Sequence, residues 1–380
     1  MLPAIDSRRS SLADVLPSVL ESLSGRTNRL GLPPAQKAIV LLVDGLGSRP
    51  LAARSGHART LTEAIVGRAS SILSRFPTTT ASALASFSTG EAPGVHGLVG
   101  YSVLDAAHDR VVNQLSGWDD RLDPATWQRL PTLFERAGEQ GIRSFAVGQE
   151  KHRGSGFTAA VLRGAEYLSG ISIADRLGEA IAALERVDTG FAYVYVPELD
   201  QLGHAKGWQS SEWTAALEIL DQSVAGVLPT LARGVGLLAT ADHGVLDVPA
   251  SGHIMFDSDP GLIDGVRHSA GEPRVLHLYF EPDASAAHRE VMRQRWFDSE
   301  GERAWVLTRS QAVQAGWFGP AVAEEVLPRI GDLVVAARKA VAYYDGRVAT
   351  PSGLAMIGQH GSWSPDETEI PLLRFGAYSV

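Results

Sequence analysis

Continuous apolar runs that stop at an aspartate constrain the fold of this chain most strongly. Three runs of this kind lead to an acidic residue: 38–43 to Asp44, 191–196 to Asp200, and 235–241 to Asp242. Runs of this length without polar alternation are typical of strands buried on both faces, as in a parallel sheet. A fourth run, in the sequence GLAMIGQHG, leads to His360 and is expected to be a further strand.

Segments with helical spacing lie between these runs. Helices are expected at 10–24, where Pro17 would kink or restart the helix, and at 131–139, 174–187 and 212–231. Strands that alternate with helices predict an α/β fold with a mostly parallel central sheet and helices on both faces. We expect residues 1–380 to form a single α/β domain, in which residues from about 262 to 345 form a small α+β insert or subdomain.

The polar residues that follow the expected strands form one candidate site. In an α/β sheet, ligands gather beyond the carboxyl ends of the strands. Aspartate and neutral histidine are ligands of zinc and related divalent ions, and the offset of four residues puts Asp200 and His204 on one face of a helical turn. Taken singly, each could be a turn-forming or structural residue. Taken together, six such residues predict a site for two metal ions: Asp44, Asp200, His204, Asp242, His243 and His360.

The stretch FPTTTASALASFSTG, residues 76–90, is rich in hydroxyl side chains. Pro77 and the threonines after it predict the start of a helix, and Gly90 is the expected end. One interpretation is simple capping. The other is that one hydroxyl is a nucleophile at the positive end of the helix, where free N–H groups hold a phosphate and the neighbouring hydroxyls satisfy the exposed backbone.

Composition restricts the partners. The formal charge of −9 argues against a broad surface for nucleic acid or anionic membranes. The absence of cysteine excludes thiolate ligands, disulfides and a cysteine nucleophile. The first residues lack a secretory pattern, and no segment approaches about 18 consecutive apolar residues. We therefore expect a cytoplasmic protein without a membrane partner.

Several motifs together resemble the alkaline phosphatase superfamily. They are DG at 44, PTTT at 77–80, TG at 89, PGVHG at 93–97, D-x-x-x-H at 200, ADHG at 241 and QHG at 359. Within that superfamily the pattern is similar to the type I phosphodiesterase and nucleotide pyrophosphatase family, and the resemblance runs from about residue 38 to 361.

The resemblance implies a mechanism. Thr80 would be the nucleophile and would form a phosphothreonine intermediate. One metal ion would be held by Asp200, His204 and His360, and the other by Asp44, Asp242, His243 and the Thr80 oxygen. The expected cofactors are two divalent ions, zinc or alternatively manganese. The implied substrate is a small phosphorylated molecule, a phosphate diester or pyrophosphate, rather than a nucleic-acid polymer.

The chain departs from the family pattern at two positions. Ala81 replaces an aromatic residue that helps to stack a nucleobase, and Ala83 replaces an asparagine that donates to a phosphate oxygen. The resemblance places His96 just outside the metal ligands. Tyr101 and Lys206 are further candidates for the pocket, whereas the basic residues 151–153 fit a solvated loop better. The sequence EPR at 272–274 could also face the pocket.

Alternative functions remain open. The same two-metal site would suit a phosphonate hydrolase or a phosphomonoesterase, because this superfamily changes substrates by changing the pocket around common metals. A non-catalytic binding protein is the alternative from a different class. The oligomeric state is not indicated by the sequence.

Overall fold

A seven-stranded sheet forms the centre of the fold. The computed structural model describes residues 2–3, 8–65 and 70–379. The strand order is β2-β17-β8-β1-β7-β5-β6. The bounds are Ser71–Leu73 (β2), Glu369–Gly376 (β17), Val235–Thr240 (β8), Lys37–Val43 (β1), Gly190–Val196 (β7), Arg143–Gly148 (β5) and Glu166–Ser169 (β6). Strands β8, β1, β7, β5 and β6 run parallel, whereas β17 is antiparallel to β8 and β2. The predicted α/β class with a mostly parallel sheet is confirmed.

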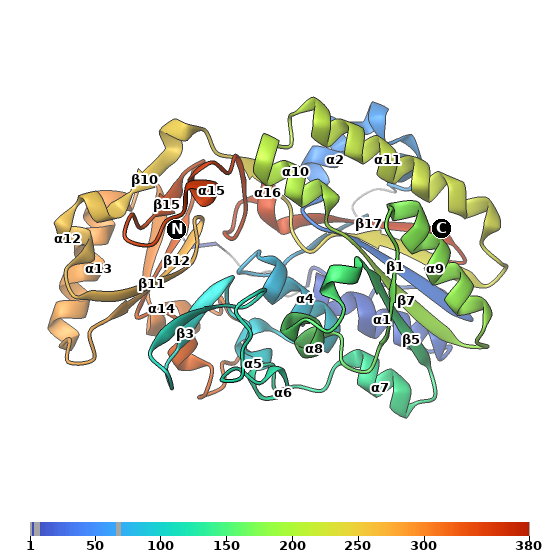
Figure 1. The fold of residues 1–380 in the computed structure, drawn as a ribbon, viewed down its shortest axis with the longest axis horizontal. Coiled ribbons are helices and arrows are strands. Elements are labelled where there is room, and N and C mark those ends of the chain that lie inside the picture. Colours follow the sequence, from blue (N-terminus) through green and yellow to red (C-terminus); the bar gives the residue numbers. More distant parts are fainter. Residues whose placement is uncertain (1, 4–7, 66–69, 380) are drawn as a thin grey trace.

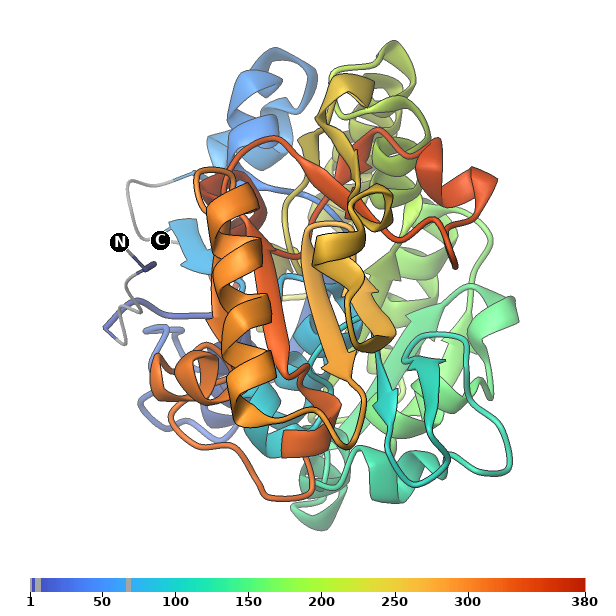
Figure 2. The same cartoon turned by 90° about the vertical axis from the view of Figure 1, so that its left-hand side faces the viewer.

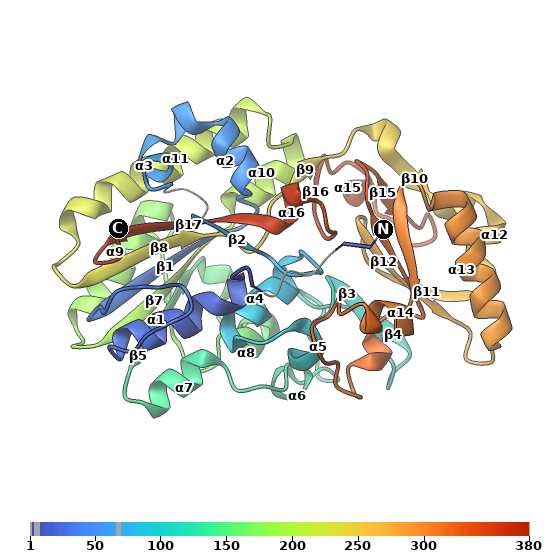
Figure 3. The same ribbon diagram turned by 180° about the vertical axis from the view of Figure 1, so that it is seen from behind.

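Helices cover both faces of this sheet (Figure 1). One face carries α2 (Ser48–Ala53), α3 (Arg59–Glu63), α9 (Ile173–Glu185), α10 (Glu198–Lys206) and α11 (Ser211–Val227). The view from behind shows α1 (Val15–Leu23), α4 (Thr80–Thr89), α7 (Leu133–Glu139) and α8 (Gly156–Val161) on the other (Figure 3). The helices predicted at 131–139, 174–187 and 212–231 are thus present with slightly different ends. Within 10–24, a 3-10 turn (Leu12–Asp14) precedes α1. Pro17 is the third residue of α1, where its missing N–H is tolerated.

The expected strand before His360 is wrong. Residues Pro351–Leu354 form α15, and only Gly358–Gln359 are extended, as β16. This short strand pairs with β9 (Leu246–Asp247), outside the central sheet. Thr350 caps α15 with its side chain, and Ile357 is exposed, so the apolar run does not lie in the core. The strand that the sheet uses instead is β17, which the chain reaches through α16 (Pro365–Thr368).

A second, antiparallel sheet lies beside the central one. Its order is β11-β12-β14-β13, with bounds Val266–Glu272, Val275–Phe280, Leu333–Ala337 and Ala304–Thr308. Helix α13 (Ala286–Glu300) packs against it, as Figure 2 shows from the side of this sheet. The sheet and helix share a hydrophobic core that includes Met292, Trp296 and Val335.

Shorter elements complete the fold around the two sheets. They are α5 (Pro93–His96), α6 (Pro124–Trp127), α12 (Pro260–Ile263), α14 (Arg309–Gln314), the hairpin β3 (Ser102–Asp105) and β4 (Arg110–Asn113), and the parallel pair β10 (His253–Met255) and β15 (Ala342–Tyr344). Among the helices of the described residues, none is both long and apolar enough to cross a membrane.

Candidate active site

The carboxyl ends of three neighbouring strands carry the acidic residues of the site. Asp44 is the first residue after β1, and Asp242 is the second after β8. Asp200 is the third residue of α10, the helix that follows β7. Because β1 pairs in parallel with both β7 and β8, these three carboxylates meet at one edge of the sheet. The prediction that the strand ends meet there is therefore confirmed for the aspartates.

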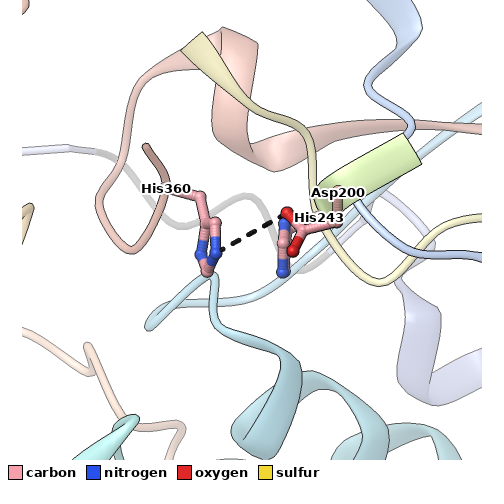
Figure 4. Close-up of side chains that lie close together, drawn as sticks. All are labelled: Asp200, His243 and His360. Carbon is pink, nitrogen blue, oxygen red and sulfur yellow. Dashed lines mark ion pairs between the residues drawn. The ribbon is translucent and has the colours of Figure 1, made fainter. Parts of the chain in front are cut away.

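Two buried groups of aspartate and histidine lie at this edge. Asp200, His243 and His360 form one triad, and Asp44, Asp242 and His243 form the other. In each triad, one ligand atom of every residue lies within 4.8 Å of the others. Nε2 of His243 is 3.4 Å from Oδ1 of Asp44 and 3.5 Å from Oδ2 of Asp242. Figure 4 shows the first triad, in which His360 Nε2 is 3.9 Å from Asp200 Oδ1.

His204 lies beside these triads but belongs to neither of them. Its Nε2 is 3.2 Å from Oδ2 of Asp200, one helical turn away on α10. Its ring centroid is 5.1 Å from that of His360. The resemblance groups His204 with Asp200 and His360, whereas the tightest grouping in the structure puts His243 in both triads. The rings of His243 and His360 are stacked, with centroids 3.7 Å apart.

All three histidines present the same nitrogen to the site. Nδ1 of His204 is 2.8 Å from the carbonyl oxygen of Gly358, and Nδ1 of His360 is 2.8 Å from that of Thr78. Nδ1 of His243 is 3.2 Å from the carbonyl oxygen of Gly244. A carbonyl only accepts hydrogen bonds, so each Nδ1 carries the proton. Nε2 of each ring therefore faces the aspartates, and it is the nitrogen that would bind a metal ion once it carries no proton.

The aspartates also fit a metal site. Asp44 Oδ1, Asp200 Oδ1 and Asp242 Oδ2 are buried and have no hydrogen-bond partner within residues 2–3, 8–65 and 70–379. Burial, together with the neighbouring carboxylates of Asp242 and Asp200, raises the pKa of Asp44 well above its usual value. Burial likewise raises the pKa of Asp242. Buried carboxylates that repel one another are stabilised by a bound cation, so the donor set suits divalent metal ions.

The pKa values of Asp200 and His360 are lowered rather than raised. Burial opposes ionisation of Asp200, but His204, His360 and His243 together lower its pKa below the usual value. The pKa of His360 lies well below its ordinary value because of burial and the neighbouring His243. His360 is therefore neutral at physiological pH, as metal binding requires.

Thr80 is the first residue of α4 and lies against His243. Its hydroxyl oxygen is 3.2 Å from His243 Nε2, the nitrogen shared by both triads. Helix α4 ends at Gly90, which has a φ of +74°, so the predicted helix and its glycine end are confirmed. The side-chain oxygen of Thr80 thus lies where the two triads meet.

The expected capping by neighbouring hydroxyls is wrong. Thr79 is the N-cap residue of α4, but its side chain makes no capping hydrogen bond. The hydroxyl of Thr78 instead donates to the carbonyl oxygen of Ser362, at 2.9 Å. The side chain of Thr78 is therefore bonded to the loop that carries His360 rather than to the helix backbone.

Glycines allow the close approach of the segments that form the site. A Cβ at Gly244 would lie 2.0 Å from the carbonyl oxygen of Asp366. Gly45 has a φ of +73°, and a Cβ there would lie 3.0 Å from Cβ and Oδ1 of Asp200. Both glycines directly follow residues of the second triad, so Asp44 and His243 are each held next to a backbone position that admits no side chain.

The other predicted site residues lie further from the triads. His96 is fully buried at the end of α5, 2.9 Å from the hydroxyl of Ser86, and its Nδ1 accepts from the N–H of Leu98 at 3.1 Å. Tyr101 precedes β3 and is partly exposed. Lys206 is exposed at the end of α10. Their roles in the site stay predictions.

The two alanines after Thr80 are both buried. Ala81 packs in a small cluster with Ala160 and Val161 of α8. Ala83 belongs to the main hydrophobic core, on a different face of α4. Neither position offers a larger side chain to a substrate.

Two further residues lie beside the triads, and the sequence indicated only one of them. The hydroxyl of Tyr195, on β7, donates a hydrogen bond to Oδ2 of Asp44. Oε2 of Glu272, at the end of β11, is 3.4 Å from Nδ1 of His360. Tyr195 lies inside an apolar run, where a tyrosine is normally interpreted as a residue of the hydrophobic core. The EPR sequence at 272–274 was a weak signal for Glu272.

Solved structures share the fold. Murine ectonucleotide pyrophosphatase/phosphodiesterase 5 superposes with a TM-score of 0.69 at 16% identity, covering 90% of this chain and 88% of that chain. Phosphonoacetate hydrolase from Sinorhizobium meliloti 1021, in complex with phosphonoformate, gives a TM-score of 0.67 at 18% identity, covering 90% and 91%. These likenesses establish the alkaline-phosphatase-like fold.

Sequence comparison finds a relative that matches a third of the chain and a family model that matches most of it. A phosphopentomutase from Anaeromyxobacter dehalogenans (strain 2CP-C) is 33% identical over 128 residues, which span 33% of this chain and only 30% of that relative. The family model described as type I phosphodiesterase / nucleotide pyrophosphatase matches residues 38–363, a range that includes both triads and Thr80. The chain therefore belongs to the type I phosphodiesterase / nucleotide pyrophosphatase family of phosphoric ester hydrolases.

Proposed function

We propose that this protein hydrolyses small phosphate diesters or pyrophosphates with two divalent metal ions and Thr80 as the nucleophile. The observation that carries this proposal is the position of the Thr80 hydroxyl, 3.2 Å from Nε2 of His243, which belongs to both triads. A nucleophile at that point is next to the histidine that the two triads share.

The metal ligands divide between two positions. Asp200, His204 and His360 would hold one ion, and Asp44, Asp242, His243 and the Thr80 oxygen would hold the other. Zinc fits the three imidazole nitrogens best, with manganese as the alternative. When bound, the two ions supply positive charge for the phosphoryl oxygens and lower the pKa of an attacking hydroxyl.

The proposed reaction consists of two successive displacements at phosphorus. The Thr80 oxygen attacks phosphorus, the P–O bond to the first product breaks, and the remaining phosphoryl group is esterified to Thr80. Water then attacks this phosphothreonine, and the Thr80 oxygen leaves. In total one water molecule adds across the P–O bond. The first N–H groups of α4, which the side chain of Thr79 leaves uncapped, are placed to donate to a phosphoryl oxygen.

Phosphonates are the second candidate substrates. The likeness to phosphonoacetate hydrolase supports them at the level of the fold. Ala81 and Ala83 also favour a compact substrate, because neither provides an aromatic wall or an amide for a nucleotide. The discrimination between diester and phosphonate then lies with groups outside α4.

An assay on model substrates tests the proposal. Wild-type protein, Thr80→Ala and Thr79→Ala would be given a nitrophenyl phosphodiester, the corresponding monoester and a phosphonate monoester, with zinc or manganese. Thr79→Ala is the matched control because Thr79 is the buried residue directly before Thr80 and its side chain makes no capping hydrogen bond to α4. We expect the wild type and Thr79→Ala to cleave the diester, and Thr80→Ala to lose at least about 1,000-fold in kcat. Equal rates for wild type and Thr80→Ala would contradict the proposal.

A further inference from the structure

The turn between β11 and β12 connects the second sheet to the loop that carries His360. Arg274 is the second residue of this turn and is fully buried. Its Nε donates to Oε1 of Glu367 at 2.9 Å, and its Nη2 donates to Oε2 at 2.7 Å. Nη1 donates to the carbonyl oxygen of Val341 at 2.8 Å. The guanidinium thus holds β15 and Glu367 in a fixed relation to the second sheet.

Glu367 in turn fixes the backbone just after His360. The side chain is fully buried. Its Oε1 accepts from the N–H of Ser362 at 2.8 Å, and Oε2 accepts from the N–H of Ser364 at 3.1 Å. Each carboxylate oxygen therefore accepts one bond from Arg274 and one from the backbone of residues 362–364. A charged group with all its bonds made is held rigidly in a buried setting.

The same loop is bonded to the segment that leads to Thr80. The Thr78 hydroxyl donates to the carbonyl oxygen of Ser362 and accepts from the N–H of Gly361, at 2.9 and 3.1 Å. Nδ1 of His360 donates to the carbonyl oxygen of Thr78 at 2.8 Å. A shift of residues 361–364 would therefore move the carbonyl that sets the His360 tautomer.

We propose that the Arg274–Glu367 pair is a positioning device for His360, through which the second sheet controls one side of the metal site. A buried ion pair adds little net stability over apolar residues of similar size, but it fixes geometry when all its hydrogen bonds are made. The expected effect on metal binding rests on the function proposed above. The expected effect on the imidazole does not.

Variants of the pair separate positioning from stability. The double variant Arg274→Met, Glu367→Met removes both charges, so neither partner is left buried and unpaired. Glu367→Gln is the conservative variant. Glu300→Gln is the matched control, since Glu300 is a buried carboxylate of α13 that accepts from Tyr343 at 2.9 Å and from Arg303 at 2.7 Å.

The first readout is the tautomer of His360 in chelator-treated protein. Nitrogen-15 NMR of labelled histidine would be recorded for all variants, with His360→Asn used to assign the signal. We expect the Nδ1-protonated form in the wild type and Glu300→Gln, and a mixture of tautomers in the double variant. If the double variant does not fold, the His360 signal of Glu367→Gln is compared with that of the wild type instead.

The second readout is zinc affinity measured by titration. We expect the double variant to bind zinc about 10-fold to 100-fold more weakly, the range seen when partners of metal ligands are removed. A folded variant of the pair that keeps both the wild-type His360 tautomer and the wild-type zinc affinity would overturn the inference. Absence of zinc binding and of ester hydrolysis in the wild type would instead count against the proposed function, while the tautomer measurement still decides the positioning role.

Discussion

The hydroxyl of Tyr195 donates a hydrogen bond to Oδ2 of Asp44 across two neighbouring parallel strands. The other oxygen of Asp44, Oδ1, faces Nε2 of His243. Tyr195 therefore fixes which oxygen of Asp44 is directed into the site. Such outer partners orient metal ligands and adjust their basicity.

Replacing Tyr195 by phenylalanine removes this hydrogen bond while keeping the ring. We expect Tyr195→Phe to fold normally and to lose about 10-fold in kcat or in metal affinity, because Asp44 can then rotate. Tyr193→Phe is the control, since Tyr193 lies on the same face of β7 and packs against Phe87 and Phe134. Steady-state kinetics and zinc titration give the comparison. Equal loss in both variants would mean that Tyr195 only fills the core.

A methyl group at position 244 is expected to displace the backbone next to His243 and so to disturb the site. In Gly244→Ala the new Cβ would lie only 2.0 Å from the carbonyl oxygen of Asp366, which must therefore move away. We expect a loss of about 1 to 3 kcal/mol in the free energy of unfolding, as for other overpacked positions, together with weaker metal binding. Gly178→Ala, within α9 and with no atom within 4 Å of its Cβ position, should instead be neutral or stabilising by about 0.5 kcal/mol. Urea unfolding of both variants provides the test. No difference between them would contradict the predicted collision.

The pH dependence of stability should contain a contribution from His96. Burial, with a smaller effect of Arg329, lowers the pKa of His96 to about 3. Its folded-state pKa is thus below the unfolded value of about 6.5, so the unfolded state binds more protons between these values. The contribution of His96 to stability is present above pH 6.5 and is lost as the pH falls toward about 3.

His96→Gln measures this contribution directly. In chelator-treated protein, the fall in unfolding free energy between pH 6 and pH 4 should be less steep in the variant by about 1.4 kcal/mol per pH unit. Urea unfolding at several pH values gives both slopes. Parallel curves for variant and wild type would show that His96 is not held neutral by burial.

Metal removal should change stability as well as activity. The three unpartnered carboxylate oxygens at the site leave repulsion that a cation relieves. At a zinc concentration about 100 times the Kd, we expect about 2.7 kcal/mol of stabilisation over chelator-treated protein. Thermal unfolding with added zinc, manganese, magnesium or calcium tests this, and magnesium or calcium acting as strongly as zinc would contradict a site built on imidazole nitrogens.

The sequence predicted the acidic half of the site better than the histidine half. Asp44 and Asp242 come one and two residues after buried parallel strands, so strand order alone brings them together. His360 reaches the site through a loop, and its position depends on hydrogen bonds to Thr78 and on Glu367, which are far apart in the sequence. The Glu367 contacts are local, whereas no local pattern encodes the bond between His360 and Thr78.

Two other features of the fold could not be predicted from the sequence, because each departs from the usual local pattern. Strand β17 contains Pro371, which argues against a central strand, yet that residue pairs only with the short edge strand β2. The apolar run before His360 read as a strand although a capped turn of helix interrupts it. Thr80 was identified through the resemblance to the family. The structure adds its contact with His243, the histidine common to both triads.

The stereochemical course at phosphorus tests the central claim most directly. A chiral phosphorothioate diester would be hydrolysed in water labelled with oxygen-18, and the configuration of the product determined. Attack by Thr80 followed by attack of water inverts phosphorus twice, so the account predicts overall retention. Overall inversion would mean that water attacks the substrate directly, and would contradict the role of Thr80 as a covalent nucleophile.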